Sequence, residues 1–109
     1  MALNRVVVTG IGALTPLGNT VSEYWQGLES GISGCDFIQQ FDVSKFKTRF
    51  ACEVKNFDPS AFGIEKKETN RLDLVSQYGI AAATQAVADS KIDAEGVDKD
   101  RVGVIWSSG

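Results

Sequence analysis

Histidine is absent from the 109 residues of this chain. Ser-His-Asp and Cys-His catalytic groups use an imidazole as their general base, and many zinc sites use one as a ligand. Those classes of site are therefore excluded for the chain taken alone. Any chemistry that these residues perform has to rest on carboxylates, lysine, tyrosine or a thiol without an imidazole partner.

Cysteine is nearly as scarce, since the chain holds only Cys35 and Cys52. Two cysteines are too few for a disulfide framework, and their spacing is not that of a metal site. They are either paired with each other or serve as small apolar packing residues, and a cytosolic chain favours the packing role. Asp36 follows Cys35 and opposes formation of its thiolate, which argues against a nucleophile there.

Long apolar runs and an excess of positive charge are also missing. No stretch approaches the ~20 consecutive apolar residues that a membrane span requires. Residues 1–5 carry no basic leader, apolar block or cleavage site of the kind that directs export. The net charge of -3 lacks the cationic excess that binding to nucleic acid usually needs. We therefore expect a cytoplasmic protein that neither inserts into membranes nor binds nucleic acid.

The residues that are present suit one globular domain with an α/β arrangement. The chain is 43% hydrophobic and 23% charged, which is typical of such domains. Apolar runs at 5–9 and 101–106 predict strands buried on both faces. Two helices and an irregular segment lie between these runs, and this order predicts a layered α/β sheet.

The two helices have different characters. Thr20 and Glu23 form a capping-box pattern at the start of the first helix, and Gly31 is suited to end it. The second helix is predicted from 71 to 90, and its middle at 79–83 consists almost entirely of small residues. A helix with so few bulky or charged residues needs close neighbours all round, so we expect it to be deeply buried.

The segment 33–64 between the helices contains all six phenylalanines of the chain. Polar residues separate these aromatics without a sustained helical period. A short strand at 50–54 and a turn at 58–60 are its expected regular features. We expect the aromatic side chains to insert into a neighbouring surface, which can belong to further or partner chain.

Glycines and a proline follow the first predicted strand, at Gly10, Gly12 and 15–18. The dinucleotide-binding fingerprint requires glycine or alanine where this chain has Thr15, and Pro16 falls where the helix of that motif should already run. No GxxxxGK(S/T) phosphate-binding motif occurs, and the acidic residues are scattered rather than paired. The segment is therefore predicted to be a structural turn in which glycine permits positive φ.

Lys66, Lys67 and Arg71 cluster at the start of the second predicted helix, together with Glu65 and Glu68. Two interpretations are open from the residues alone. The charges form either a solvated helix entrance or a small cationic surface on which an acidic partner lands. Such a surface speeds encounter more than it tightens binding.

Taken together, the motifs of the whole chain resemble a known family. They are Arg5 to Gly12, Thr15 to Asn19, Trp25 with Gly31, Ser33-Gly34, Phe41-Asp42, Phe50-Ala51, Phe57, Arg71 to Asp73, Gln77 to Ala82 and Arg101 to Val104. The chain is similar to the opening of the condensing enzymes of fatty-acid synthesis, and most closely to the β-ketoacyl-acyl-carrier-protein synthase II type. This resemblance implies a thiolase-like layered α/β fold with sheets stacked around buried helices. Residues 1–109 are then the incomplete N-terminal part of a β-ketoacyl synthase domain.

The resemblance implies a decarboxylative Claisen condensation for the complete enzyme, with no cofactor. In the family a cysteine takes the acyl group as a thioester, and two histidines help to decarboxylate malonyl-acyl carrier protein. The family's catalytic residues lie beyond Gly109, and neither Cys35 nor Cys52 matches the nucleophile. We therefore assign no catalytic, cofactor-binding or metal-binding residue, and we expect this piece alone to be inactive.

Two groups of residues match non-catalytic features of the family. Lys66, Lys67 and Arg71 match the basic stretch that helps to dock acyl carrier protein. The terminal Ser107-Ser108-Gly109 matches a Gly-Ser-Gly turn in which Ser108 and Gly109 flank the acyl pocket, and Ser107 replaces the first glycine. The family also implies a homodimer when the subunit is complete.

Two classes of function remain as alternatives. The first is an acyltransferase, either of fatty-acid elongation or in the related ketosynthase domain of a polyketide synthase. The second is a non-catalytic protein, either a degenerate condensing-enzyme partner or a small acyl-carrier-binding module. A cysteine followed by two well-separated histidines in coding sequence after Gly109 supports the enzyme.

Overall fold

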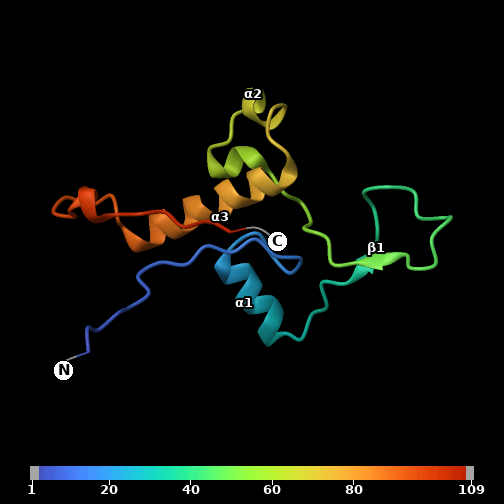
Figure 1. Cartoon of the computed structure of the whole chain (residues 1–109). Helices are drawn as coiled ribbons and strands as arrows, with labels where there is room; N and C mark the ends of the chain where they lie inside the picture. The colour runs from blue at the N-terminus through green and yellow to red at the C-terminus, as the bar shows by residue number, and fades with distance from the viewer. Residues whose placement is uncertain (1–2, 108–109) are drawn as a thin grey trace.

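Helix α3 (Leu74–Ser90) lies at the centre of the structure, and the other elements branch away from it (Figure 1). The computed structural model describes residues 3–107. The remaining elements are α1 (Val21–Glu29), β1 (Asp36–Phe37), β2 (Phe50–Ala51), the 3₁₀ helix η1 (Pro59–Phe62), α2 (Lys66–Thr69) and the 3₁₀ helix η2 (Lys99–Arg101).

The chain is extended, and it encloses almost no core of its own. Its radius of gyration is 17.5 Å, whereas a compact domain of this length has about 13 Å. Among the described residues, the buried hydrophobic side chains are Ile64 and Ala81. Most of the apolar surface of the chain is therefore open to further packing.

Helix α1 begins and ends as its sequence predicts. The Thr20 hydroxyl accepts a hydrogen bond from the Glu23 amide at 3.2 Å, which satisfies one of the free donors of the first turn. At the other end Gly31 has a φ of 64°. The amide of Ile32 donates to the Gly27 carbonyl at 3.0 Å, as in a Schellman motif.

Helix α3 begins three residues later than predicted, because Asp73 caps it. The Asp73 carboxylate accepts a hydrogen bond from the Ser76 amide at 2.8 Å. Side-chain and backbone hydrogen bonds from Ser76 hold the pKa of Asp73 below its ordinary value. Residues 71–73 therefore belong to the turn before the helix, whereas the predicted end at Ser90 is confirmed.

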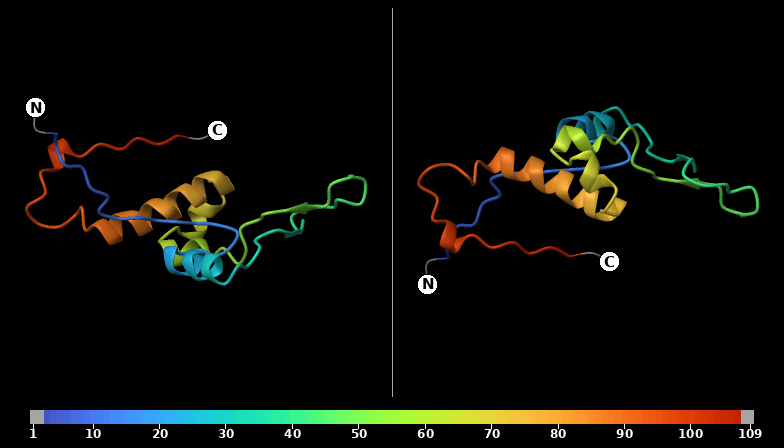
Figure 2. Two further views of the ribbon diagram at one scale, coloured as in Figure 1. Left: turned by 90° about the horizontal axis from the view of Figure 1, so that it is seen from below. Right: turned by 90° about the horizontal axis from the view of Figure 1, so that it is seen from above.

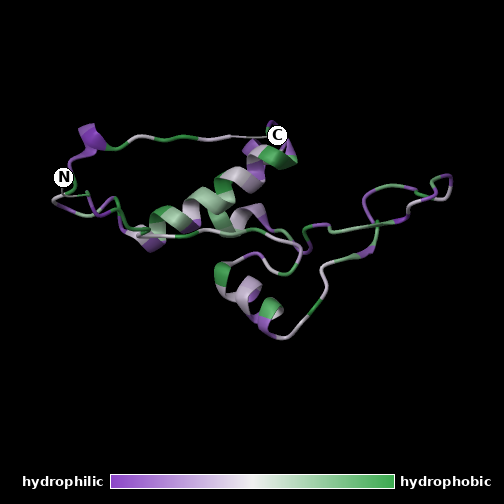
Figure 3. Cartoon of the chain, turned by 60° about the horizontal axis from the view of Figure 1, so that its bottom comes forward, coloured by the Kyte–Doolittle hydropathy of each residue, from purple (hydrophilic) through white to green (hydrophobic). Residues whose placement is uncertain are grey.

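The second helix is largely uncovered within the described residues, so its burial by further parts of a complete subunit stays a prediction. Gln77 and Ala81 are the buried residues of α3, while Val75 remains 64% exposed and Ile80 40% exposed. The reason is that the described residues place few neighbours around the helix. Figure 3 shows apolar residues along α3 and along the terminal segments beside it.

The predicted strands at 5–9 and 101–106 are not strands in the structure. Figure 2 shows both terminal segments following α3 without joining into a sheet. A strand needs a neighbour to accept and donate its backbone hydrogen bonds, and neither segment has one within the described residues. Val6 is 90% exposed and Ile105 is 98% exposed, so the apolar side chains expected to be buried lie open.

The segment that contains Gly10 and Gly12 owes its glycines to close packing rather than to positive φ. The positive-φ glycines of the described residues are elsewhere. A Cβ on Gly12 would overlap the carbonyl oxygen of Ala82, and a Cβ on Gly10 would lie 2.5 Å from the carbonyl oxygen of Ala86. The predicted turn follows at 15–18, where the Thr15 and Gly18 backbones exchange hydrogen bonds of 2.9 and 3.2 Å.

The sheet of the structure is small and comes from the irregular segment. Strands β1 and β2 pair antiparallel and carry a loop that projects away from α3, and we call residues 36–51 the arm (Figure 1). The strand expected at 50–54 is therefore confirmed for its first two residues. The turn expected at 58–60 leads into η1, and the Asp58 carboxylate caps it by accepting the Ser60 amide at 3.0 Å.

The isolated chain of residues 1–109 is expected to unfold on heating without a cooperative transition. Its buried side chains are too few to offset the conformational entropy that a single native state costs. Circular dichroism should record a gradual loss of helix signal. A sharp transition with equal calorimetric and van't Hoff enthalpies would contradict this prediction.

Candidate docking surface

Helix α2 is a single turn whose acidic residues stabilise its own start. The Glu68 carboxylate accepts a hydrogen bond from the Glu65 amide at 3.1 Å, and the Glu68 amide donates to the Glu65 carbonyl at 2.8 Å. The Thr69 hydroxyl donates to the Lys66 carbonyl at 2.8 Å. These bonds define the backbone of the turn and leave the cationic side chains out of it.

Gln77 fastens this turn to α3. The side chain is 6% exposed, and its amide nitrogen donates to the carbonyls of Leu72 at 2.8 Å and Thr69 at 3.3 Å. Ile64, which follows η1, is also buried and is 3% exposed. A buried amide needs such partners, and here they are the carbonyls that end α2 and lead into α3.

Aromatic side chains also pack between the residues before α2 and helix α3. The rings of Phe57 and Tyr78 meet edge to face with centroids 4.9 Å apart, and Phe57 also stacks on Phe62 at 5.9 Å. These contacts join η1 to α3. The aromatic segment therefore packs partly within the chain, while Phe37 and Phe50 of the arm remain 68% and 60% exposed.

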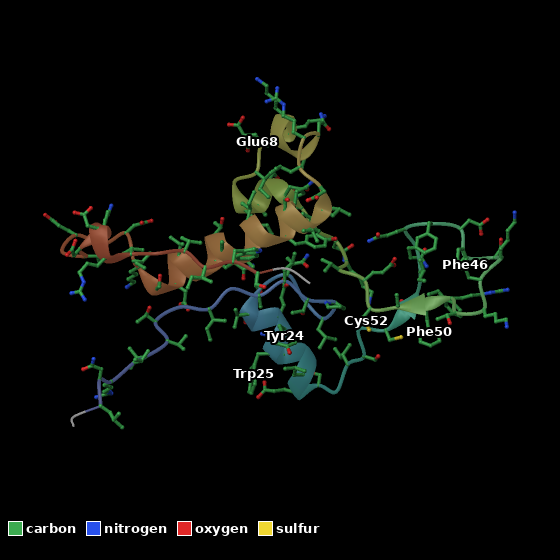
Figure 4. The ribbon with its side chains drawn as sticks, viewed as in Figure 1. Tyr24, Trp25, Phe46, Phe50, Cys52 and Glu68 are labelled. Carbon is green, nitrogen blue, oxygen red and sulfur yellow. The ribbon has the colours of Figure 1, made fainter. Side chains whose placement is uncertain are left out.

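The three cationic residues lie on one exposed helix–turn segment. Lys66 and Lys67 belong to α2, and Arg71 belongs to the turn before α3, so they are not the start of the long helix as predicted. All three are exposed. Figure 4 shows nitrogen-bearing side chains extending from α2 beside Glu68. This segment carries three cationic side chains and two carboxylates, Glu65 and Glu68, and the Glu68 carboxylate accepts a backbone hydrogen bond. We call Lys66, Lys67 and Arg71 the cationic surface.

The predicted acyl-pocket flank falls mostly outside the described residues. Ser108 and Gly109 lie beyond them, and Ser107 is exposed. The preceding Trp106 rests on α3, because a Cβ on Gly79 would lie 2.9 Å from the indole ring. This contact sets where the final segment meets the helix.

The position of Gln77 was the feature that sequence patterns did not reveal. Gln77 lies on the same face of the helix as Ala81, one turn later, so its position in the sequence could have indicated a buried side chain. The partners of its amide are backbone carbonyls, however, and no side-chain pattern identifies those.

Within residues 3–107, no group of three or more histidine, cysteine, aspartate or glutamate residues has the arrangement of a metal site. No helix in that range has the length and apolar character needed to cross a membrane.

A central small-residue helix flanked by two apolar segments is part of a thiolase-like ketosynthase fold. The solved structure of the ishigamide ketosynthase/chain length factor matches with a TM-score of 0.70 at 38% sequence identity. The match covers 78% of this chain and 21% of that chain. The chain is therefore a fragment of a thiolase-like ketosynthase N-terminal domain, and the residues described are mostly helical with one small sheet.

The chain belongs to the family of β-ketoacyl synthase N-terminal domains, whose model matches residues 3–109. The 3-oxoacyl-(acyl-carrier-protein) synthase 2 of Vibrio harveyi is 47% identical over 109 residues, which are 100% of this chain and 26% of that protein. The protein of the same name from Synechocystis is 43% identical over 105 residues, which are 96% of this chain and 25% of that protein. The chain thus spans about a quarter of the length of these curated relatives. The resemblance to the N-terminal part of synthase II is confirmed.

Proposed function

We propose that this chain is the N-terminal part of a 3-oxoacyl-acyl-carrier-protein synthase that elongates fatty acids in the cytoplasm as a homodimer. The observation that carries the proposal is the identity along the whole chain to relatives that bear this name, 46% over all 109 residues for the Vibrio cholerae protein. The reaction is the condensation of an acyl-enzyme thioester with malonyl-acyl carrier protein, with loss of carbon dioxide.

The residues described here contribute support and docking rather than bond-making. Without histidine, the chain offers no imidazole to stabilise the charge that develops on decarboxylation. Helix α3 provides small residues that further elements of the subunit can approach closely. The terminal segments provide exposed valines, and such apolar segments can become buried strands when further parts of the subunit supply neighbours in a sheet.

Acyl carrier protein is the partner that we propose for the cationic surface. Lys66, Lys67 and Arg71 are exposed on a turn whose backbone is anchored by Gln77, so the charges are presented from a fixed base. An acidic partner is drawn toward such a surface before contact, which raises the association rate.

The non-catalytic alternative has one observation in its favour. The solved structure that matches this chain is that of a ketosynthase named together with a chain length factor. Likeness to that structure therefore does not by itself distinguish a condensing enzyme from a partner subunit. Activity of the complete protein does distinguish them.

The proposal predicts that the complete subunit carrying this chain releases carbon dioxide from malonyl-acyl carrier protein and forms 3-oxoacyl-acyl carrier protein, whereas residues 1–109 alone do neither. Cys35→Ser and Cys52→Ser variants of the subunit should keep their activity, because neither thiol matches the nucleophile. Product formation is followed by mass spectrometry of the carrier protein. An inactive complete subunit would support the partner role, and loss of activity in either cysteine variant would place the nucleophile here.

A further inference from the structure

Cys35 and Cys52 lie directly opposite each other at the base of the arm. Strands β1 and β2 pair in antiparallel register, with Asp36 opposite Ala51 and Phe37 opposite Phe50. One step back along the first strand and one step forward along the second bring Cys35 opposite Cys52. Residues that face each other across an antiparallel ladder point to the same side of it, so the two thiols share a face.

The hydrogen bonds of the ladder place this pair at a narrow position. The Ile38 amide donates to the Arg49 carbonyl at 3.0 Å, which makes that pair a hydrogen-bonded one. Hydrogen-bonded and non-hydrogen-bonded pairs alternate, so Cys35 and Cys52 fall at a non-hydrogen-bonded position. The Cα atoms of such pairs are about 4.5 Å apart, which lies inside the range of roughly 4.4–6.8 Å found across disulfides.

The surroundings of the pair are consistent with direct contact between the thiols. Partial desolvation, followed by the charge and hydrogen bond of Cys52, raises the pKa of Cys35. Lys55 holds the two strands together beside the pair, since its ammonium group donates to the Gly34 carbonyl at 3.0 Å. Both cysteines are exposed and free, and Figure 4 shows Cys52 at the base of the arm. The absence of a third ligand among the described residues argues against a metal there.

We propose that Cys35 and Cys52 are a redox modification site, at which a small-molecule disulfide such as oxidised glutathione forms a reversible cross-strand disulfide. The Cys52 thiolate attacks one sulfur of oxidised glutathione, giving a mixed disulfide and one glutathione thiolate. The deprotonated Cys35 then attacks the Cys52 sulfur and releases the second glutathione. Two protein thiols are oxidised, one glutathione disulfide is reduced to two thiols, and the two protons pass to the released thiolates.

The consequence of the bond is a closed ring that contains the whole arm. The ladder holds the arm by two pairs of strand residues, and its loop carries exposed Phe41 and Phe46, whose rings contact each other with centroids 6.0 Å apart. A covalent link at the base limits how far the strands can separate. This inference does not depend on the proposed condensing activity.

The test uses the complete protein that carries this chain, equilibrated in glutathione buffers of increasing oxidised fraction and then trapped with an alkylating reagent. Trypsin cleaves at lysines and arginines within the arm, so it separates the two cysteines unless they are bonded. Oxidised samples should contain peptide 6–45 linked to peptide 50–55, and the link should disappear on reduction. Alkylation of both cysteines at every buffer ratio would overturn the proposal.

Two controls separate the cross-strand bond from other oxidation products. In an equal mixture of isotopically heavy and light protein, linked peptides should be wholly heavy or wholly light, and mixed pairs would overturn an intramolecular bond. A double variant, Ala51→Cys with Cys52→Ala, moves the thiol by one residue and therefore to the other face of the ladder. Its linked fraction should fall to background. Equal linkage in this variant would overturn the register on which the site depends.

Discussion

Replacing Gly12 by alanine in the complete protein is expected to lower its free energy of unfolding by roughly 1–3 kcal/mol, the usual cost of overpacking. The added Cβ would overlap the Ala82 carbonyl oxygen and would lie 2.9 Å from the Ala86 amide nitrogen. Both neighbours are helix backbone, which does not rotate away as a side chain does. The segment must therefore move off α3. Urea unfolding of the variant measures the loss directly.

That movement would also break the hydrogen bonds that join the segment to α3. The Gln85 amide nitrogen donates to the Ala13 carbonyl at 3.0 Å and to the Asn19 carbonyl at 2.9 Å. The Asp89 carboxylate accepts the Ile11 amide at 3.0 Å. Because these bonds connect one short segment to one helix face, a shift at Gly12 affects all of them together.

Gly103→Ala is the matched control for this prediction. Among residues 3–107 a Cβ on Gly103 meets nothing within 4 Å, and this glycine is not one of those with positive φ. The same substitution should therefore change stability little there. Equal losses in the Gly12 and Gly103 variants would show that the helix backbone is not the obstacle.

Local capping and periodicity predicted the helices because those signals lie within a few neighbouring residues. Thr20 and Gly31 gave the limits of α1, whereas the start of α3 was missed because the Asp73 cap competes with the helical pattern of the residues before it. The strands at 5–9 and 101–106 failed for a different reason. Their apolar residues are typical of strands that are buried in a sheet. A sheet requires neighbouring strands, and the described residues do not contain them.

A candidate site was predictable only where its residues are close to each other in the sequence. Lys66, Lys67 and Arg71 are close in sequence, so any turn brings them near each other. Cys35 and Cys52 were expected either to be paired or to serve as small packing residues, and in the structure both are free and exposed. Their juxtaposition depends on the register of a short ladder, which neither cysteine encodes by itself.

Reversing the charges of the cationic surface should slow association of the complete synthase with acyl carrier protein by about 10- to 100-fold at low ionic strength. The variant carries Lys66→Glu, Lys67→Glu and Arg71→Glu. All three side chains are exposed, so the change acts on the encounter and leaves the base at Gln77 in place. Stopped-flow measurement at low and high salt tests this, and the difference should shrink toward 1 M salt, where the screening length falls to about 3 Å.

The decisive comparison is a second variant with the same change in net charge at another place. Lys45, Lys47 and Arg101 are also exposed, on the arm and on η2, and they again comprise two lysines and one arginine. Reversing them alters the overall field equally but leaves the charge beside α2 unchanged. A docking surface predicts a much smaller decrease for this variant. If both variants slow association by the same factor, net charge alone accounts for the effect, and α2 has no special part in receiving the carrier protein.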